Sequence, residues 1–190
     1  MNFNVIKKIV KQSLIDLYEQ DSILLRNDAC ERSITHRLAI CIEKRIAELN
    51  NNEVSHLSVD CEYNRNVAGG FNAPKYLIIE SEDEIKKLNE FGRQSEEALE
   101  ISSYPDIIVH QRGTNDYNLL VIEVKKISSR ISVSHDIKKL KAFTKKDECN
   151  EYGYSFGVLI KLDTRDLDGN QPICEWYSKG RQKAVKQNIM

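Results

Sequence analysis

Residues 105–125 read PDIIVHQRGTNDYNLLVIEVK, and the fold class of the chain can best be read from them. They contain two apolar runs, 106–111 and 118–125, separated by residues 112–117. This intervening segment is rich in residues that form turns, among them glycine, asparagine and aspartate. Two apolar runs joined in this way are typical of a β-hairpin. The stretch therefore predicts two antiparallel strands that are neighbours in a sheet.

The register of this hairpin follows from its apolar pattern. If Gln111 lies opposite Asn118 across the turn, then Asp106 lies opposite Glu123 at the other end. The same register gives one face of the hairpin four apolar side chains: Ile107, Val109, Leu120 and Ile122. A slip of one residue would turn the apolar set of one strand to the opposite face, which a sheet with a buried face resists.

This register brings three charged side chains together at one end of the sheet. Opposed residues have Cβ atoms about 4.5–5.5 Å apart, and residues two apart on a strand point the same way. Asp106, Glu123 and Lys125 are therefore expected to share one patch. Neighbouring carboxylates repel each other unless a positive charge lies between them, and Mg²⁺ prefers oxygen ligands of this kind. A lysine beside the ion can orient or help to deprotonate a water and can stabilise charge on a phosphate. The pattern thus predicts metal-assisted hydrolysis of a phosphodiester.

Each half of the pattern also has a simpler interpretation. A strand that ends in Glu-x-Lys can present two solvated charges at a sheet edge, and Pro105-Asp106 can be a turn before a strand. The spacing and the register of the two together favour the site.

Length and composition are those of a globular protein. The chain has 190 residues, of which 41% are hydrophobic and 30% are charged, so we expect one domain over 1–190. No stretch approaches the ~18–20 apolar residues of a membrane span. The first residues, MNFNVIKK, carry charge where a signal peptide needs an apolar core. We therefore expect no membrane partner and a cytoplasmic location.

The net charge of −1 conceals an uneven distribution of charge. Residues 123–146 contain eight basic and two acidic residues, a local balance of +6. A basic segment that starts at the predicted site and continues along the next helix is what binding to a phosphate backbone would require. The alternative is a lysine-rich helix face that is simply solvated.

The remaining elements follow from helical and strand periodicities. Helices are expected at residues 3–25, 28–49, 82–91, 133–146 and 180–187. Strands are expected at 56–63, 76–79, 154–162 and 173–177, the last at an edge of the sheet. Asp28 and Ser134 are candidate N-caps. We divide the domain into an N-terminal helix at 3–25, a core at 28–162 with an insertion at 64–103, and a C-terminal extension at 163–190.

The element order over 28–162, with Asp106 opening the second core strand and Glu123-x-Lys125 closing the third, resembles the PD-(D/E)xK nuclease superfamily. The resemblance implies the restriction-endonuclease-like fold, an α/β architecture with a mixed central sheet of four to five strands flanked by helices in the core order αβββαβ. It also implies a catalytic site that uses Mg²⁺, for which Mn²⁺ can substitute. Asp106 and Glu123 would hold the metal and Lys125 would position the attacking water. Glu31 matches the acid that many members add from the first core helix, both as a metal ligand and as a catalytic residue.

The same resemblance implies a nucleic-acid substrate, DNA more than RNA, and an endonuclease in a defence or mobile-element context. Lys126, Lys138 and Lys139 are the residues we expect to contact phosphates. The enzyme could act as a homodimer or with a partner protein. Two other functions remain open. One is a nuclease-like domain that binds nucleic acid or a protein without cutting, and the other is an interaction module whose lysine helix docks on an acidic partner.

Overall fold

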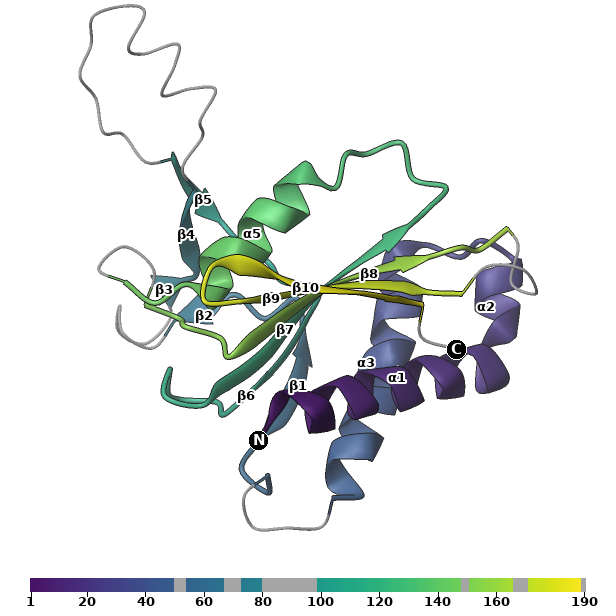
Figure 1. Ribbon diagram of the computed structural model, residues 1–190, viewed down its shortest axis with the longest axis horizontal. Helices are drawn as coiled ribbons and strands as arrows, with labels where there is room; N and C mark the ends of the chain where they lie inside the picture. Colours follow the sequence, from purple (N-terminus) through teal and green to yellow (C-terminus); the bar gives the residue numbers. More distant parts are fainter. Residues whose placement is uncertain (50–53, 67–72, 80–98, 148–150, 166–170, 189–190) are drawn as a thin grey trace, which may run out of the picture.

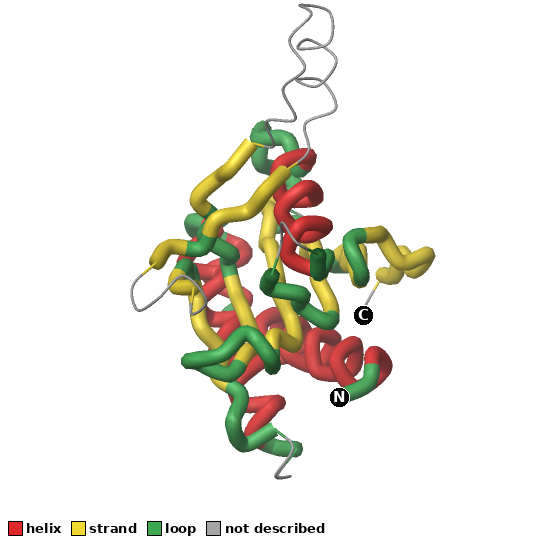
Figure 2. The backbone as a smooth tube through the Cα atoms, turned by 90° about the vertical axis from the view of Figure 1, so that its left-hand side faces the viewer, coloured by secondary structure: helices red, strands yellow, loops and turns green. Residues whose placement is uncertain are grey.

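The computed structural model describes residues 1–49, 54–66, 73–79, 99–147, 151–165 and 171–188. It is an α/β structure in which a mixed six-stranded sheet lies between two helical layers. Helices α1 and α3 cover one face of the sheet and α5 covers the other (Figures 1 and 2). The predicted fold class, a mixed sheet flanked by helices, is confirmed, although the sheet has six strands and not four to five.

The elements are placed in the following order along the chain. The helices are α1 Phe3–Gln20, α2 Ser22–Arg26, α3 Glu31–Ala47 and α5 Ser134–Thr144. The strands of the main sheet are β1 Ser58–Cys61, β6 Ile107–His110, β7 Asn118–Lys126, β8 Phe156–Leu162, β9 Ile173–Ser178 and β10 Arg181–Asn188. Two further ladders pair β2 Arg65–Asn66 with β3 Ala73–Pro74, and β4 Tyr76–Ile79 with β5 Leu99–Ser102. The order α3, β1, β6, β7, α5, β8 matches the expected core order.

The predicted hairpin is formed by β6 and β7, and its register is confirmed along most of its length. Ile107 pairs with Ile122, and Val109 pairs with Leu120. Beyond Val109 a β-bulge shifts the pairing, so that Asn118 lies opposite His110 and not opposite Gln111 as expected. The irregularity lies at the turn and leaves the pairing at the other end of the hairpin unchanged.

Both faces of this hairpin are buried. The alternate residues Ile107 and Ile122 belong to the apolar core under α1 and α3. Ile108 and Val121 point the other way, into a second core under α5. Strand β7 pairs with β8 in parallel, and α5 makes the crossover between them, as a parallel pair requires. The sheet is therefore an interior layer, and the charged residues Asp106 and Lys125, both partly exposed, lie at the ends of its strands.

The first core helix begins later than predicted. Asp28 has φ 49, a left-handed conformation, and the N-cap of α3 is Cys30. An N-cap typically has extended backbone angles, as Cys30 has, and Asp28 lies two residues before that position. Its carboxylate instead accepts a hydrogen bond from Thr164 Oγ1 at 2.6 Å and lies 2.9 Å from Lys126 Nζ. Ser134 is likewise not the N-cap of α5, because Val133 takes that position.

The predicted helix at 3–25 is two helices. The chain bends at Asp21, which ends α1 and precedes the short α2. Arg37 of α3 donates a hydrogen bond from Nε to Asp21 Oδ2 at 2.9 Å and holds this corner. The bend lets α1 pack along α3 while Leu25 of α2 is fully buried.

The C-terminal prediction is wrong: of residues 180–187, expected to be helical, Gly180 lies in a turn and 181–187 lie in strand β10. Lys179 and Gly180 both have positive φ, and Ser178 pairs with Arg181 across them. Two residues with positive φ make the tight hairpin turn that matches the twist of antiparallel strands. Strand β9 is consequently not an edge strand, because β10 lies outside it.

The expected strand at 76–79 is confirmed as β4, whereas the helix expected at 82–91 lies outside the described residues. The subdivision of the domain stays a prediction. Across the described ranges, no helix combines the length and apolar character needed to cross a bilayer.

Candidate active site

Asp106 lies one residue before β6, at the end of the hairpin opposite the turn. Its Oδ2 accepts a hydrogen bond of 2.7 Å from the backbone N–H of Val124 on β7. Pro105 precedes it and is buried, so the chain enters the strand in a fixed direction. Burial raises the pKa of the Asp106 carboxyl, and the bond from Val124 and the charge of Lys139 offset part of this rise.

Glu123 lies on β7, one residue beyond the Ile107–Ile122 pair, and only 3% of it is exposed. Its Oε1 lies 2.7 Å from Lys139 Nζ, which reaches down from α5. Burial is the main cause that raises the pKa of Glu123 to about 8, and the Asp106 carboxylate raises it further while Lys139 lowers it. Glu123 is therefore a buried acid whose charge depends on the cation beside it.

Lys125 lies two residues further along β7, on the same face as Glu123. Its Nζ is 3.4 Å from Glu31 Oε2 and 3.6 Å from Asp136 Oδ2. Burial alone would lower the pKa of Lys125, but Asp136 and Glu31 outweigh it and raise this pKa. Lys125 is thus an ammonium at neutral pH, held between two acids from opposite helical layers.

Glu31 reaches the site from the first turn of α3. Besides contacting Lys125, its Oε1 accepts a hydrogen bond of 3.0 Å from the backbone N–H of Lys126. This bond ties the start of α3 to the end of β7. The structure therefore brings Asp106, Glu123, Lys125 and Glu31 to one end of the sheet.

The three lysines predicted to contact phosphates lie in different surroundings. Lys126 Nζ pairs with Asp28 at 2.9 Å and donates to the carbonyl of Ala29 at 3.1 Å. Lys139 is 8% exposed and faces Glu123. Lys138 is exposed. Of the three, Lys138 is the one that reaches solvent freely, so the phosphate contacts stay a prediction.

Asp136 also belongs to this charge cluster, although the sequence did not lead us to predict it as a site residue. It lies 13% exposed on α5, one turn before Lys139. Its Oδ2 is buried and accepts no hydrogen bond from the residues that the structure describes. A signal was present in the sequence, because Asp136 precedes the apolar Leu140 and Phe143 by four and seven residues. An acid at that spacing lies on the buried face of a helix.

A second polar cluster lies further along the same face of the hairpin. Asp60 of β1 accepts hydrogen bonds from Arg112 Nε at 2.8 Å and interacts with His110 Nε2 at 2.9 Å. Beside it, Lys75 is 1% exposed and donates a hydrogen bond of 3.0 Å to Tyr154 Oη. The ammonium of Lys75 also lies 5.2–5.6 Å from the ring centres of three tyrosines, Tyr63, Tyr152 and Tyr154. The Asp60 carboxylate therefore forms its hydrogen bonds within this second cluster.

A small pocket of about 180 Å³ adjoins Asp106. It is lined by Arg32, Thr35, Cys61, Glu62 and Asp106. Arg32 is largely exposed, and its Nε lies 2.7 Å from Glu62 Oε1. The opening beside the carboxylates thus carries an arginine at its rim, a group suited to a phosphate oxygen.

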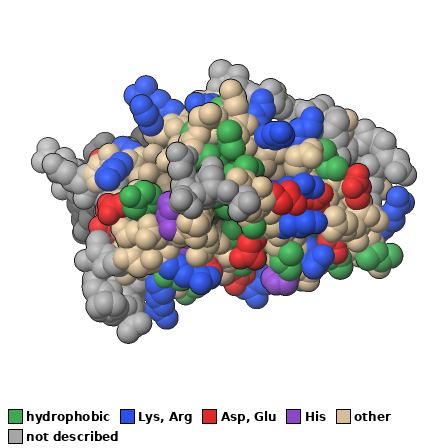
Figure 3. Space-filling view, turned by 90° about the horizontal axis from the view of Figure 1, so that it is seen from below, with side chains coloured by type: hydrophobic (Ala, Val, Ile, Leu, Met, Phe, Trp, Pro, Cys, Tyr) green, Lys and Arg blue, Asp and Glu red, His purple; other side chains and the backbone are tan. Residues whose placement is uncertain are grey.

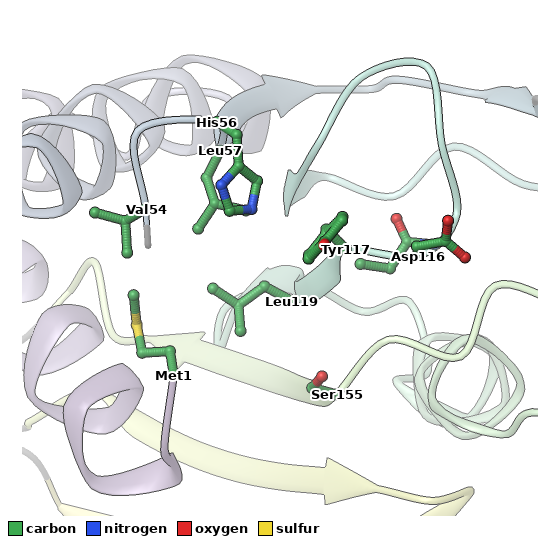
Figure 4. Close-up of a pocket in the computed structure, with 9 residues that line it drawn as sticks. Met1, Val54, His56, Leu57, Asp116, Tyr117, Leu119 and Ser155 are labelled. Carbon is green, nitrogen blue, oxygen red and sulfur yellow. The ribbon is translucent and has the colours of Figure 1, made fainter. Parts of the chain in front are cut away.

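The larger pocket is far from these charges. It has a volume of about 380 Å³ and lies at the turn end of the hairpin, where Leu119, Val54 and Met1 approach one another (Figure 4). The rings of His56 and Tyr117 meet edge to face at its side, with centroids 4.8 Å apart. Lys125 lies six positions beyond Leu119 on β7, which is roughly 20 Å of strand. This pocket is not part of the charged cluster.

The side of the molecule on which α1 lies carries acidic and basic side chains intermingled (Figure 3). Two ion pairs join the N-terminal helices, Arg37 with Asp21 and Arg45 with Asp16. The charges within these two pairs offset each other, whereas α5, on the opposite face of the sheet, exposes Lys138 and Lys141. Lys145, the C-cap of α5, is also exposed, and its ammonium lies 2.7 Å from Asp147 Oδ2.

The two carboxylates at the strand ends are donors of the kind that a hard divalent ion prefers. Asp106 and Glu123 supply oxygen atoms, and Glu123 Oε1 lies close to Lys139 without forming an aligned hydrogen bond. Mg²⁺ is commonly bound through one or two carboxylates and keeps several waters. Within the described part of the chain, no group of three or more His, Cys, Asp or Glu side chains is placed to hold a metal. Any ion here would therefore be held by few protein ligands.

Comparisons with protein-family models, with curated proteins and with solved structures gave no match.

Proposed function

We propose that the protein is a Mg²⁺-dependent nuclease of the PD-(D/E)xK type, with DNA as its substrate and internal cleavage as its mode of attack. The observation that carries the proposal is the hairpin register, which ends with Asp106 one step beyond Ile107 and Glu123 one step beyond Ile122. Lys125 lies on the same face as Glu123, since both contact α5. This arrangement of two acids and one lysine suits hydrolysis of a phosphodiester.

Each residue has a distinct role in the proposed reaction. Asp106 and Glu123 would hold the divalent ion, which supplies Lewis acidity and neutralises charge on the phosphoryl group when bound. Asp106 is oriented for this by the Val124 N–H. Lys125 is kept protonated by Asp136 and Glu31. It therefore orients the attacking water and stabilises negative charge on the phosphoryl oxygens, and it does not accept the water's proton.

Glu31 has a positioning role in this scheme. It contacts Lys125 and the backbone of Lys126, and so fixes the ammonium relative to the end of β7. A ligand role for Glu31 would require it to leave one of these two partners.

The alternative is a nuclease-like domain that binds nucleic acid or a protein partner without cutting. One observation favours it: the Glu123 carboxylate already has a cation, the Lys139 ammonium at 2.7 Å. If that ion pair is permanent, the two carboxylates do not need a metal ion to offset their negative charge.

Cleavage of supercoiled plasmid DNA with Mg²⁺ tests the proposal directly. The wild-type protein should nick or linearise the plasmid, and EDTA should stop it. Lys125→Met should abolish cleavage and leave DNA binding intact, because the lysine acts on the transition state. Asp106→Asn should lose both cleavage and metal binding, since an amide ligand removes one negative charge.

The control is Lys161→Met, which removes a lysine that lies directly beside Lys125 on β8. The ammonium of Lys161 pairs with Glu175 at 2.8 Å, so this variant should cut as the wild type does. DNA and RNA substrates that both stay intact, together with tight binding, would favour the non-cutting alternative. Cleavage by Lys125→Met at the wild-type rate would refute the role of that residue.

A further inference from the structure

The Lys139 side chain occupies an unusual place for a lysine on a helix rich in exposed lysines. It turns inward, is 8% exposed and places its ammonium 2.7 Å from Glu123 Oε1. Its Nζ also donates a hydrogen bond of 3.2 Å to the backbone carbonyl of Tyr104. Tyr104 lies two residues before Asp106, so this bond connects α5 to the segment that carries the first acid.

The Lys139 ammonium occupies the position in which a cation would neutralise the Asp106 and Glu123 carboxylates. It is ion-paired with Glu123, and its charge also acts on Asp106. The geometry with Glu123 is close but not aligned as a hydrogen bond. A divalent ion between the same acids would face a positive charge at short range, and like charges in a buried site repel strongly.

Lys125 does not occupy the same position. Its ammonium is held by Glu31 and Asp136, at 3.4 and 3.6 Å. The site therefore contains two lysines with separate acid partners, so that one can leave while the other stays.

We propose that Lys139 is the resident cation of the Asp106–Glu123 pair, and that a divalent ion binds these carboxylates only by displacing the Lys139 ammonium. This inference rests on the proposed function, because it concerns the metal of that same site. Once displaced, the long lysine stem turns outward beside Lys138 and Lys141, which are exposed on α5. Entry of the ion would then add a cation to the surface that faces a phosphate backbone, and binding of metal and nucleic acid would reinforce each other.

Amine labelling of the wild-type protein tests the displacement. An acylating reagent is applied with and without Mn²⁺, and modification of each lysine is measured by mass spectrometry. Labelling of Lys139 should rise severalfold and saturate with Mn²⁺. Lys138, which is exposed, and Lys75, which is 1% exposed, should keep their labelling unchanged.

Binding of Mn²⁺, measured by the loss of the free-ion paramagnetic resonance signal, supplies the second arm. Lys139→Met should bind Mn²⁺ at least roughly tenfold more tightly than the wild type, about 1.4 kcal/mol, in a buffer alkaline enough to keep Glu123 ionised. Lys138→Met, the matched control one residue away, should bind as the wild type does.

The outcomes separate this inference from the proposed function. Binding of Mn²⁺ to the wild type with Lys139 labelling unchanged would overturn the displacement and leave the metal-dependent function standing. Binding to Lys139→Met alone would support the competition but remove the metal-dependent function from the wild-type chain. The absence of Mn²⁺ binding in both proteins would overturn both proposals.

Discussion

The buried Lys75 gives a quantitative test of the structure through its effect on stability against pH. Its ammonium lies among three tyrosine rings, with no ion pair to a carboxylate of the described residues, and burial lowers the pKa of Lys75 from 10.5 to about 8. The charge of Asp60 offsets only part of this shift. The folded protein should therefore release this proton at a lower pH than the unfolded chain does.

The sign of the effect follows from proton linkage. Between the folded and unfolded pKa values of Lys75, the unfolded chain binds one proton more than the folded protein, so the free energy of unfolding rises with pH. With the pKa lowered from 10.5 to about 8, the gain between about pH 7 and about pH 10 is about 2–3 kcal/mol. The gain should be absent in Lys75→Met, which has no proton to release.

Urea unfolding of both proteins across this pH range measures the difference. Subtracting the two curves removes the ionisation of tyrosines and other groups common to both. Lys183→Met is a matched control, since its ammonium also lies over a ring, 4.6 Å from the centre of Phe3, but is less buried. Parallel curves for the wild type and Lys75→Met would refute the reasoning, because they would mean that Lys75 titrates alike in both states.

Two further predictions concern α5 and its packing. If Lys138, Lys141 and Lys145 contact backbone phosphates, replacing all three with glutamine should weaken binding to every sequence alike. The plot of log affinity against log salt should also flatten by about 0.7–0.9 per lost contact. Fluorescence anisotropy across a salt series measures this slope, and an unchanged slope would mean that these lysines are only solvated. Gly157→Ala should lower the free energy of unfolding by roughly 1–3 kcal/mol in urea unfolding, because a Cβ there would lie 3.0 Å from Thr144 Cγ2. Adding Thr144→Ser, which removes that methyl group, should restore most of the lost stability. A double variant as unstable as Gly157→Ala would mean that the loss has another cause.

The hairpin could be predicted from the sequence because its constraints are local and agree with one another. Ile107, Val109, Leu120 and Ile122 form one face in a single register, and a slip would expose that face. The position of Asp106 relative to Glu123 followed from this register. The bulge at His110 could not be foreseen, since either pairing at the turn satisfies the same apolar pattern.

The errors arose where tertiary contacts decide between local alternatives. Residues 180–187 contain basic and polar residues that suit either a helix or an edge strand, and the outcome depends on the turn at Lys179 and Gly180 and on the free edge of β9. Asp28 resembles an N-cap in the sequence, but in the structure its carboxylate contacts Thr164 and Lys126 and does not cap the helix. Those partners are 136 and 98 residues away along the chain.

The sequence predicts which residues meet at the site, but it does not predict how their charges are paired. The sequence indicates that Asp106, Glu123 and Lys125 share a patch, and it places Lys139 on a basic helix. Whether a helix lysine points to solvent or to a buried acid depends on the distance between α5 and β7. That distance is fixed by side-chain packing across the sheet and has no signature in a single sequence.

The β4–β5 ladder has a consequence for how the chain can change length. It brings Ile79 and Leu99 into direct pairing, so the two ends of segment 80–98 start from neighbouring points on a closed stem. For any flexible chain closed between two neighbouring fixed points, the entropic cost of closure rises only logarithmically, by about 0.6 kcal/mol for each doubling of its length. The β4–β5 ladder therefore marks a point at which the chain can gain or lose residues, or carry a fused segment, at a small cost in closure entropy.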